Sequence, residues 1–168
     1  KYADVKKIKI RLKYSVPDDF SVKIPEEYFD RIAENLIDNA ASFASTVEVT
    51  LSSCSENGFV LTVEDDGKGI NPDDISKIFE RFYSERDDSQ KHCHTGLGLS
   101  IVKSITDVLD GEIYAGNSEE LGGAKFSVKF SKLKYSEIKY KKIDEYNNSF
   151  VVQPLERGMA NTIGNSLR

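Results

Sequence analysis

The sequence has no apolar run approaching the ~18 residues that a membrane-spanning helix needs. Its first residues, 1–7, also lack the apolar core of a signal peptide. Neither membrane insertion nor secretion is therefore expected of this stretch, and we expect a soluble, cytoplasmic piece. At 168 residues it has the size of one ordinary domain with a real core, which is large enough for an enzyme.

Cysteine is scarce, and basic residues are not in excess. The two cysteines, Cys54 and Cys93, lie in a strand-like run and in a polar loop, which favours reduced thiols in the cytosol. The 23 basic residues are outnumbered by 28 acidic ones, giving a net charge of −5. This balance argues against nucleic acid as the main partner, although it is compatible with a local basic patch.

The first part of the chain predicts strands followed by a helix. Residues 5–14 alternate apolar and basic side chains, which is typical of a strand with one solvated face. Residues 21–24 form a second extended piece. Pro25 is then expected to open a helix, because proline is tolerated at the first helical position.

The predicted helix carries an apolar stripe beside a polar one. Residues at helical spacing form the apolar stripe, which we interpret as core: Ile32, Leu36, Ala40 and Phe43. Asn35 and Asn39 lie four residues apart and therefore share the neighbouring face of the helix.

A hairpin is predicted next, because the alternating runs 47–51 and 59–63 are separated by Asn57-Gly58. The second run leads into Glu64-Asp65-Asp66-Gly67-Lys68-Gly69-Ile70. The strand thus delivers a carboxylate, and then a backbone with few side chains, to its carboxyl end, where a ligand can approach the main chain. Taken alone, this stretch is equally compatible with an ordinary turn.

The rest of the chain predicts a mixed array of elements. In order, these are a short helix over 71–79, a mobile loop over 84–95, an amphipathic helix over 97–109 capped by Gly111, and strands at 113–115 and 126–130 joined through a Gly122-Gly123 turn. This order predicts an α+β fold, a two-layer sandwich with helices on one face of a mixed, mostly antiparallel sheet.

Four segments resemble, in order, the N, G1, F and G2 boxes of the catalytic ATP-binding domain of bacterial sensor histidine kinases, in the GHKL superfamily. They are 35–40, 65–70, 78–83 and 95–100. Each box is modest by itself, but four in this order are specific. The resemblance covers about Ile8 to Phe130 and implies a Bergerat-type fold with a flexible ATP lid, so we predict that residues 1–130 form the ATP-binding domain.

The resemblance implies ATP and Mg²⁺ as cofactors. Asp65 would accept a hydrogen bond from the exocyclic amine of adenine, where guanine offers a carbonyl instead. Asn39 would be a magnesium ligand through its amide oxygen. The alternatives are a turn cap for Asp65 and a helix-surface amide for Asn39.

Gly96 and Gly98 precede a predicted helix, whose first amides and dipole can meet phosphate oxygens. Phe43, Ile70 and Leu97 are plausible apolar walls for the base. The full set of expected nucleotide-binding residues is Asn39, Phe43, Asp65, Gly67, Gly69, Ile70, Lys91, Thr95, Gly96, Leu97, Gly98 and Leu99.

The resemblance also implies which reaction is favoured. In gyrase-type and chaperone-type relatives, a glutamate at the position of Asn35 acts as general base for water. Asn35 cannot take a proton, so phosphoryl transfer to another group is favoured over hydrolysis. We expect Asn35, Asn39 and Arg86 to be the catalytic residues.

The chain departs from the family pattern mainly on the phosphate side. Ser42 stands where the family often has a phosphate-contacting lysine, and Phe43 replaces the following tyrosine. Ser84 stands where the lid often has arginine, and His94 replaces a glycine. Among Arg86, Arg81 and Lys91, we take Arg86 as the first choice to supply the missing charge, and weaker nucleotide binding than is usual in the family is expected.

His92-Cys93-His94 offers three metal ligands, but without a fourth at suitable spacing we favour solvated lid residues over a zinc site. Neither histidine lies on an amphipathic helix beside an acidic residue, which is the setting of the family's phosphoacceptor. The acceptor histidine is therefore expected on a separate domain, in cis or in trans, with a response regulator further along. The parent protein would be an inner-membrane sensor kinase, attached to the membrane through other segments.

Residues 131–168 are predicted to be an appended, incomplete tail. The stretches 149–158 and 162–168 resemble the start of the bacterial RNA polymerase alpha subunit, which suggests a fusion, a frameshifted junction or an artefact. Two alternatives to a kinase stay open at this point. One is a degenerate nucleotide-binding or docking module without turnover, and the other is a fragment associated with RNA polymerase.

Overall fold

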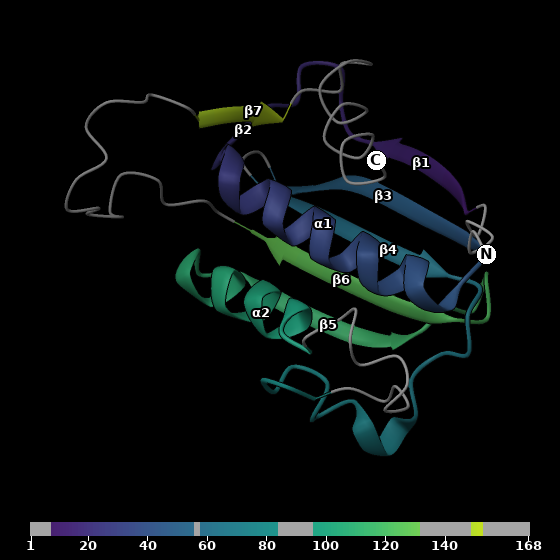
Figure 1. Ribbon diagram of the computed structural model, residues 1–168. Coiled ribbons are helices and arrows are strands. Elements are labelled where there is room, and N and C mark those ends of the chain that lie inside the picture. The colour runs from purple at the N-terminus through teal and green to yellow at the C-terminus, as the bar shows by residue number, and fades with distance from the viewer. Residues whose placement is uncertain (1–7, 56–57, 84–95, 132–148, 153–168) are drawn as a thin grey trace, which may run out of the picture.

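A computed structural model describes residues 8–55, 58–83, 96–131 and 149–152. Its centre is a five-stranded sheet with two helices, α1 and α2, on one face (Figure 1). In spatial order the strands are β1 (Lys9–Ser15), β3 (Thr46–Ser55), β4 (Gly58–Asp65), β6 (Ala124–Phe130) and β5 (Glu112–Asn117). The predicted α+β sandwich is confirmed.

The sheet is mixed but mostly antiparallel. β1 pairs parallel to β3, whereas β3–β4, β4–β6 and β5–β6 are antiparallel ladders. The predicted hairpin is confirmed as the β3–β4 pair, which contains a register shift between Ser53 and Ser55. Asn57, on which that prediction depended, lies outside the described residues.

Helix α1 (Glu26–Phe43) begins one residue after Pro25, which is its N-cap rather than its first helical residue. Two glutamates, Glu26 and Glu27, occupy the first turn, where negative charge favours the helix dipole. The apolar stripe is buried as predicted, except that Phe43 at the end of the helix is only half-buried.

Helix α2 (Gly98–Val108) ends in a Schellman motif, in which the Gly111 N–H bonds to the Thr106 carbonyl and the Asp110 N–H bonds to that of Asp107. The residue in the left-handed conformation is Asp110, with φ of 57°, and not Gly111 as the sequence suggested. Gly111 is needed for a different reason: an added Cβ would come within 2.5 Å of the Phe130 ring.

The predicted helix over residues 71–79 is wrong in its type and length. The structure has a short 3₁₀ helix, η1 (Pro72–Asp74), followed by turns to Phe79. Asn71 caps it by accepting a hydrogen bond from the Asp73 N–H at 3.2 Å. Asn-Pro-Asp is a strong start signal, and Ile75, Ile78 and Phe79 keep helical spacing, but the chain continues in turns toward Phe82, whose φ of 66° is left-handed.

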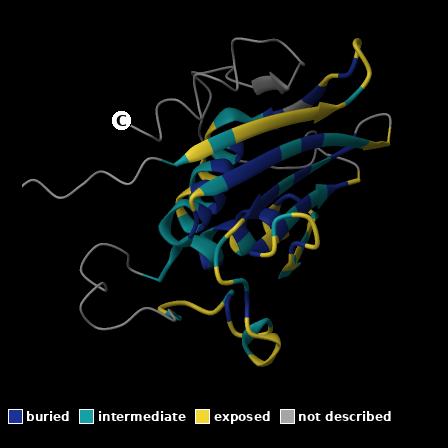
Figure 2. Ribbon diagram, turned by 90° about the vertical axis from the view of Figure 1, so that its right-hand side faces the viewer, coloured by how far each residue is buried: buried dark blue, intermediate teal, exposed yellow. Residues whose placement is uncertain are grey.

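The core lies between the sheet and the two helices, where the dark-blue residues of Figure 2 gather. Phe59 at the start of β4 is nearly inaccessible, and its ring lies 6.2 Å from that of Phe29 in α1 and 5.2 Å from that of Phe130 in β6. Helix and sheet are thus joined by aromatic contacts as well as aliphatic ones. Edge strand β1 is mostly exposed (Figure 2). The burial of one face that the sequence predicts for this strand is therefore only weakly present.

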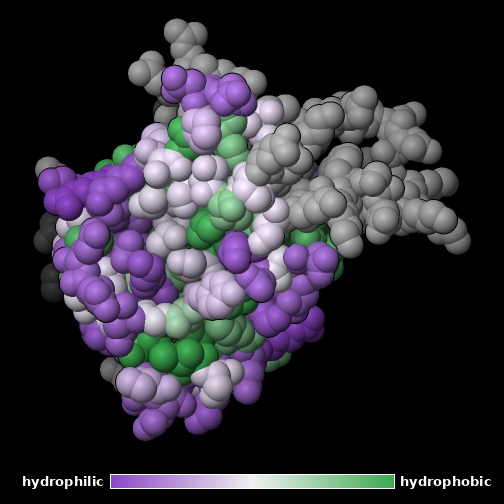
Figure 3. Space-filling view, turned by 180° about the vertical axis from the view of Figure 1, so that it is seen from behind, coloured by the Kyte–Doolittle hydropathy of each residue, from purple (hydrophilic) through white to green (hydrophobic). Residues whose placement is uncertain are grey.

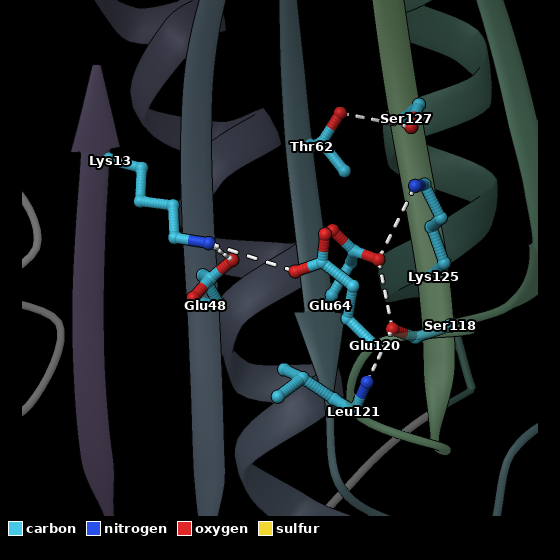
Figure 4. Close-up of polar contacts among 9 residues, drawn as sticks. All are labelled: Lys13, Glu48, Thr62, Glu64, Ser118, Glu120, Leu121, Lys125 and Ser127. Carbon is cyan, nitrogen blue, oxygen red and sulfur yellow. Dashed lines mark hydrogen bonds and ion pairs between the residues drawn. The ribbon is translucent and has the colours of Figure 1, made fainter. Parts of the chain in front are cut away.

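The opposite face of the molecule, seen in Figure 3, mixes hydrophilic and near-neutral residues with smaller hydrophobic patches. On it, Glu48 and Glu64 stand directly opposite each other in the β3–β4 ladder, which alone would be repulsive. Each has its own lysine, with Lys13 at 2.6 Å from Glu48 and Lys125 at 3.3 Å from Glu64 (Figure 4). Opposite charges from β1 and β6 therefore make the like-charged pair tolerable.

A separate two-stranded sheet joins β2 (Val22–Pro25) to β7 (Ser149–Val152) in antiparallel register. β7 is the described part of the tail predicted for residues 131–168. The boundary between domain and tail stays a prediction. Among the described residues, no helix is both long and apolar enough to cross a membrane.

Candidate functional site

Asp65 is the last residue of β4, and its side chain faces the helices. Strand alternation puts it on the same side as the buried Leu61 and Val63, while Glu64 faces the other way. Its Oδ1 accepts hydrogen bonds from the N–H groups of Gly67 at 2.8 Å and Ala124 at 3.1 Å. Asp65 is only 3% exposed, so it is a carboxylate held deep in the protein.

Both of these hydrogen bonds end on the same carboxylate oxygen, Oδ1. Burial raises the pKa of Asp65, and the charge of Asp66 adds to this, while the two backbone N–H groups act in the opposite direction. The site can therefore present an acceptor to an amine in a poorly hydrated place. This fits the exocyclic amine of adenine.

Asp66 has a different task. Its Oδ1 accepts from the N–H groups of Ser45 at 2.7 Å and Thr46 at 2.8 Å, and its own N–H bonds to the Thr46 carbonyl. These backbone donors lower the pKa of Asp66. The second acid of the pair thus ties the loop after β4 to the connection between α1 and β3.

The turn between β5 and β6, residues 118–123, supports the end of β4. The Gly123 N–H bonds to the Asp65 carbonyl at 2.9 Å. A Cβ on Gly123 would lie 2.3 Å from both Asp65 O and Asp65 Oδ1, so only glycine allows this approach. Nearby, Ser118 donates to Glu64 at 2.9 Å and accepts from the Leu121 N–H (Figure 4).

Helix α2 packs beside α1, the helix that carries the two asparagines (Figure 1). A Cβ on Gly98 would meet Asn35 Oδ1 at 2.9 Å, so Asn35 lies directly against the first turn of α2. The Asn35 amide donates to the Arg31 carbonyl at 2.6 Å. Asn39 is half-buried one turn further along. The predicted N and G2 boxes are therefore neighbours in space.

The predicted apolar walls belong to different elements. Phe43 ends α1, and the Nζ of Lys68 lies 5.3 Å from its ring centroid, a cation–π distance. Ile70 is 8% exposed, whereas Leu97 and Leu99 are half-buried at the start of α2. Phe43 also approaches the G1 loop, because its carbonyl oxygen would be 3.1 Å from a Cβ on Gly67.

A hydrogen bond links the residues just before the predicted lid to those just after it. It runs from the Phe82 N–H to the Gly96 carbonyl at 3.0 Å. Both residues have left-handed backbones, with φ of 66° and 67°. Phe82 is 74% exposed, although its position in the F box, whose phenylalanines we expected to pack the base of the lid against the body, predicts burial. Phe79 does pack against the core as a partly buried residue.

Several predicted residues lie outside the described residues. They are Ser84, Arg86, Lys91, His92, Cys93, His94 and Thr95. In the part of the chain that is described, no group of three His, Cys, Asp or Glu could hold a metal ion. Magnesium bound together with a nucleotide usually keeps several waters and takes one or two protein ligands beside the phosphate oxygens.

Three residues that support the site were not predicted from the sequence: Asp66, which ties the loop after β4; Gly123, which contacts Asp65; and Asn117, whose side chain bonds to Ile70. Gly122-Gly123 was visible as a turn signal, but its spatial neighbour was not. Asn117 carries no signal of its own, because its partner is 47 residues away in the sequence.

Residues 25–134 match the family model of histidine kinase-, DNA gyrase B- and HSP90-like ATPases. The sensor protein RstB of Escherichia coli is 40% identical over 122 residues, which cover 70% of this chain and 27% of RstB. The sensor protein ChvG of Agrobacterium fabrum is 38% identical over 107 residues, covering 58% of this chain and 18% of ChvG.

Solved structures agree with these sequence relatives. Full-length ShkA in complex with AMPPNP has a TM-score of 0.56 and 26% identity, covering 74% of this chain and 26% of ShkA. The catalytic domain of the histidine kinase ThkA has a TM-score of 0.60 over 73% of this chain and 79% of that domain. At 24% identity, the ThkA likeness shows the fold alone.

The chain belongs to the family of histidine kinase-, DNA gyrase B- and HSP90-like ATPases, and the relatives it matches are sensor histidine kinases. It spans less than a third of the length of RstB and of ChvG. The ligand in the ShkA structure is AMPPNP. None of these relatives supports the suggested link between residues 131–168 and RNA polymerase.

We predict that Gly123→Ala destabilises the protein, because the new methyl group would collide with backbone and carboxylate atoms of Asp65. Overpacking of this kind costs about 1–3 kcal/mol. Urea unfolding should show it as a lower midpoint. Gly116→Ala is the matched control, since nothing lies within 4 Å of its added Cβ. Equal midpoints for the two variants would contradict the contact.

Proposed function

We propose that this chain binds Mg-ATP and transfers the γ-phosphoryl group to a histidine on a separate phosphoacceptor domain. The observation that carries the proposal is the arrangement around the first turn of α2, where Asn35 lies against Gly98 while Asp65 is held at the end of β4. These are three of the four boxes that the sequence resembles. The family membership and the kinase relatives support the same activity.

Asp65 is proposed to select adenine. Its Oδ1 is held by two backbone N–H groups, so the orientation of Oδ2 is fixed before a base arrives. A preorganised acceptor loses little side-chain entropy on binding. Ile70 on one side and Phe43 on the other would provide apolar surface for the ring.

The phosphate side is proposed to lie at the N-terminus of α2. Gly96, Leu97, Gly98 and Leu99 would bring backbone amides to phosphate oxygens, assisted by the helix dipole. Asn39 would hold Mg²⁺ through its amide oxygen, and Lys91, Thr95 and Arg86 of the lid would contact the nucleotide. ATP bound there supplies the phosphoryl group, and catalysis comes from positioning and charge neutralisation.

Asn35 is proposed to disfavour hydrolysis. Its amide donates to the Arg31 carbonyl, and it has no carboxylate with which to take a proton from water. The phosphoryl group would then pass to an acceptor nitrogen, with ADP released. The acceptor domain would be in cis or in trans, and a response regulator would receive the phosphoryl group afterwards.

A second candidate is a nucleotide-binding module without turnover. Ser42 stands where the family often has a phosphate-contacting lysine, and its hydroxyl donates to the Asp38 carbonyl of its own helix at 2.7 Å. At the position where relatives often contact phosphate with a lysine side chain, this chain therefore has a short serine hydroxyl that bonds to the helix backbone. This favours weaker phosphate binding and slower transfer.

We further propose that residues 1–130 are the ATP-binding domain and 131–168 an appended tail. The parent protein would be an inner-membrane sensor kinase with this domain in the cytoplasm. The relatives RstB and ChvG are sensor proteins of which the matched part is a minor fraction. An interaction of the tail with RNA polymerase is not part of the proposal.

Asp65→Asn should abolish ATP binding measured by titration calorimetry with magnesium, because the amide loses the charge that accepts the adenine amine. For the natural protein, affinity should fall on acidification, because burial raises the pKa of Asp65 above its ordinary value and protonation removes the acceptor charge. Proton binding thus favours the free folded protein, and ionisation favours the complex.

Asp18→Asn is the matched control, because it removes one carboxylate charge from an exposed turn. Its affinity should equal that of the natural protein. Unchanged ATP affinity in Asp65→Asn would sink the adenine assignment.

Asn39→Ala should remove the dependence of ATP binding on magnesium. Calorimetric affinities with magnesium and with a chelator should converge in the variant and differ in the natural protein. Arg31→Ala, at an exposed position two turns earlier in the same helix, is the control and should keep the difference. If the dependence persists without Asn39, the metal ligand lies elsewhere.

Transfer itself is tested by mixing the chain with the phosphoacceptor domain of a sensor kinase and γ-labelled ATP. We expect the label on a histidine of that domain, in amounts that rise with time and require magnesium. Tight ATP binding without any label would favour the module without turnover. Absence of ATP binding would contradict both candidates.

A further inference from the structure

We propose that Asn117 is a positioning residue of the nucleotide site, an inference that rests on the proposed function. Asn117 ends β5, and its side chain bonds to both backbone groups of Ile70. Its Oδ1 accepts from the Ile70 N–H at 2.6 Å, and its Nδ2 donates to the Ile70 carbonyl at 3.0 Å. The Asn117 side chain thus bonds to the N–H and the carbonyl of Ile70, as the backbone of a neighbouring strand would.

This pairing holds residues 66–71, which follow β4 and belong to no strand of the sheet. Ile70 follows Gly69, whose φ of 74° turns the chain back after β4. A Cβ on Gly69 would lie 2.7 Å from Asn117 Oδ1, so the turn is pressed against the asparagine. Ile70 is nearly buried, and its backbone groups depend on Asn117 for these two bonds.

The same rung of the sheet also holds Asp65. Asn117 pairs with Ala124 in the β5–β6 register, and the Ala124 N–H donates to Asp65 Oδ1. One pair of residues, Asn117 and Ala124, therefore holds both Asp65 and Ile70, the polar and apolar walls of the proposed base site. Asn117 acts by setting the distance between these walls and not by contacting the nucleotide.

The test uses the full chain with ADP as the probe, in the variants Asn117→Ala and Asn117→Asp. Asn117→Ala loses both bonds, and the affinity for ADP should fall by about tenfold, the effect of two modest hydrogen bonds. At pH 8 the carboxylate of Asn117→Asp still accepts from the Ile70 N–H but faces the Ile70 carbonyl with a negative charge. Its affinity should fall at least as far.

Acid should rescue the second variant. A protonated carboxyl group has one acceptor and one donor, as the amide has, so it can restore both bonds. The ratio of natural to Asn117→Asp affinity should therefore shrink from pH 8 to pH 5, while the ratio for Asn117→Ala stays constant. Taking ratios removes the effect of Asp65, which titrates in every variant.

Asn71→Ala is the matched control, since Asn71 is an exposed cap next to Ile70 that bonds to Asp73. It should bind ADP like the natural protein. Affinity unchanged in Asn117→Ala, or a ratio for Asn117→Asp that does not change with pH, would overturn the proposal.

A separate readout distinguishes this inference from the proposed function. Hydrogen exchange of the Ile70 amide in the nucleotide-free protein should be faster in Asn117→Ala and unchanged in Asn71→Ala. If the natural protein did not bind ADP, the proposed function would fall, and the role of Asn117 at the nucleotide would fall with it. If ADP bound and exchange at Ile70 were unaltered in Asn117→Ala, only the inference would be overturned.

Discussion

The rest of the site depends on one buried carboxylate and the backbone that surrounds it. Asp65 sits at the end of β4, where N–H groups from Gly67 and Ala124 converge on one of its oxygens. An ionised carboxylate in this position is costly unless it is hydrogen-bonded. The close approach of the β5–β6 turn, which requires a glycine at 123, supplies part of that bonding.

That constraint links the two faces of the sheet. Asp65 faces the helices, while its neighbour Glu64 faces away and is bound by Ser118 and Lys125. The β5–β6 turn therefore contacts consecutive residues on opposite faces of β4. A change in this turn would be felt at the proposed base site even though the turn is not one of the four sequence boxes.

Much of the fold could be predicted because its signals are local. Alternating apolar residues identified the hairpin and the closing strands, and helical spacing identified α1 and α2. The errors were also local. The segment after Asn71 forms only a 3₁₀ turn. The left-handed residue after α2 is Asp110, whereas the prediction favoured Gly111 because glycine adopts this conformation easily. Glycine is needed at position 111 because the Phe130 ring leaves no room for a Cβ.

The sequence by itself determined the family and the order of its boxes, because glycines and carboxylates at fixed spacings are visible along the chain. Tertiary structure decided how the stretch around Asp65 is held. Its partners are Ser45 and Thr46 before it in the chain, and Asn117, Gly123 and Ala124 after it. These contacts join residues 20 to 59 positions apart in the chain, so no local pattern records them.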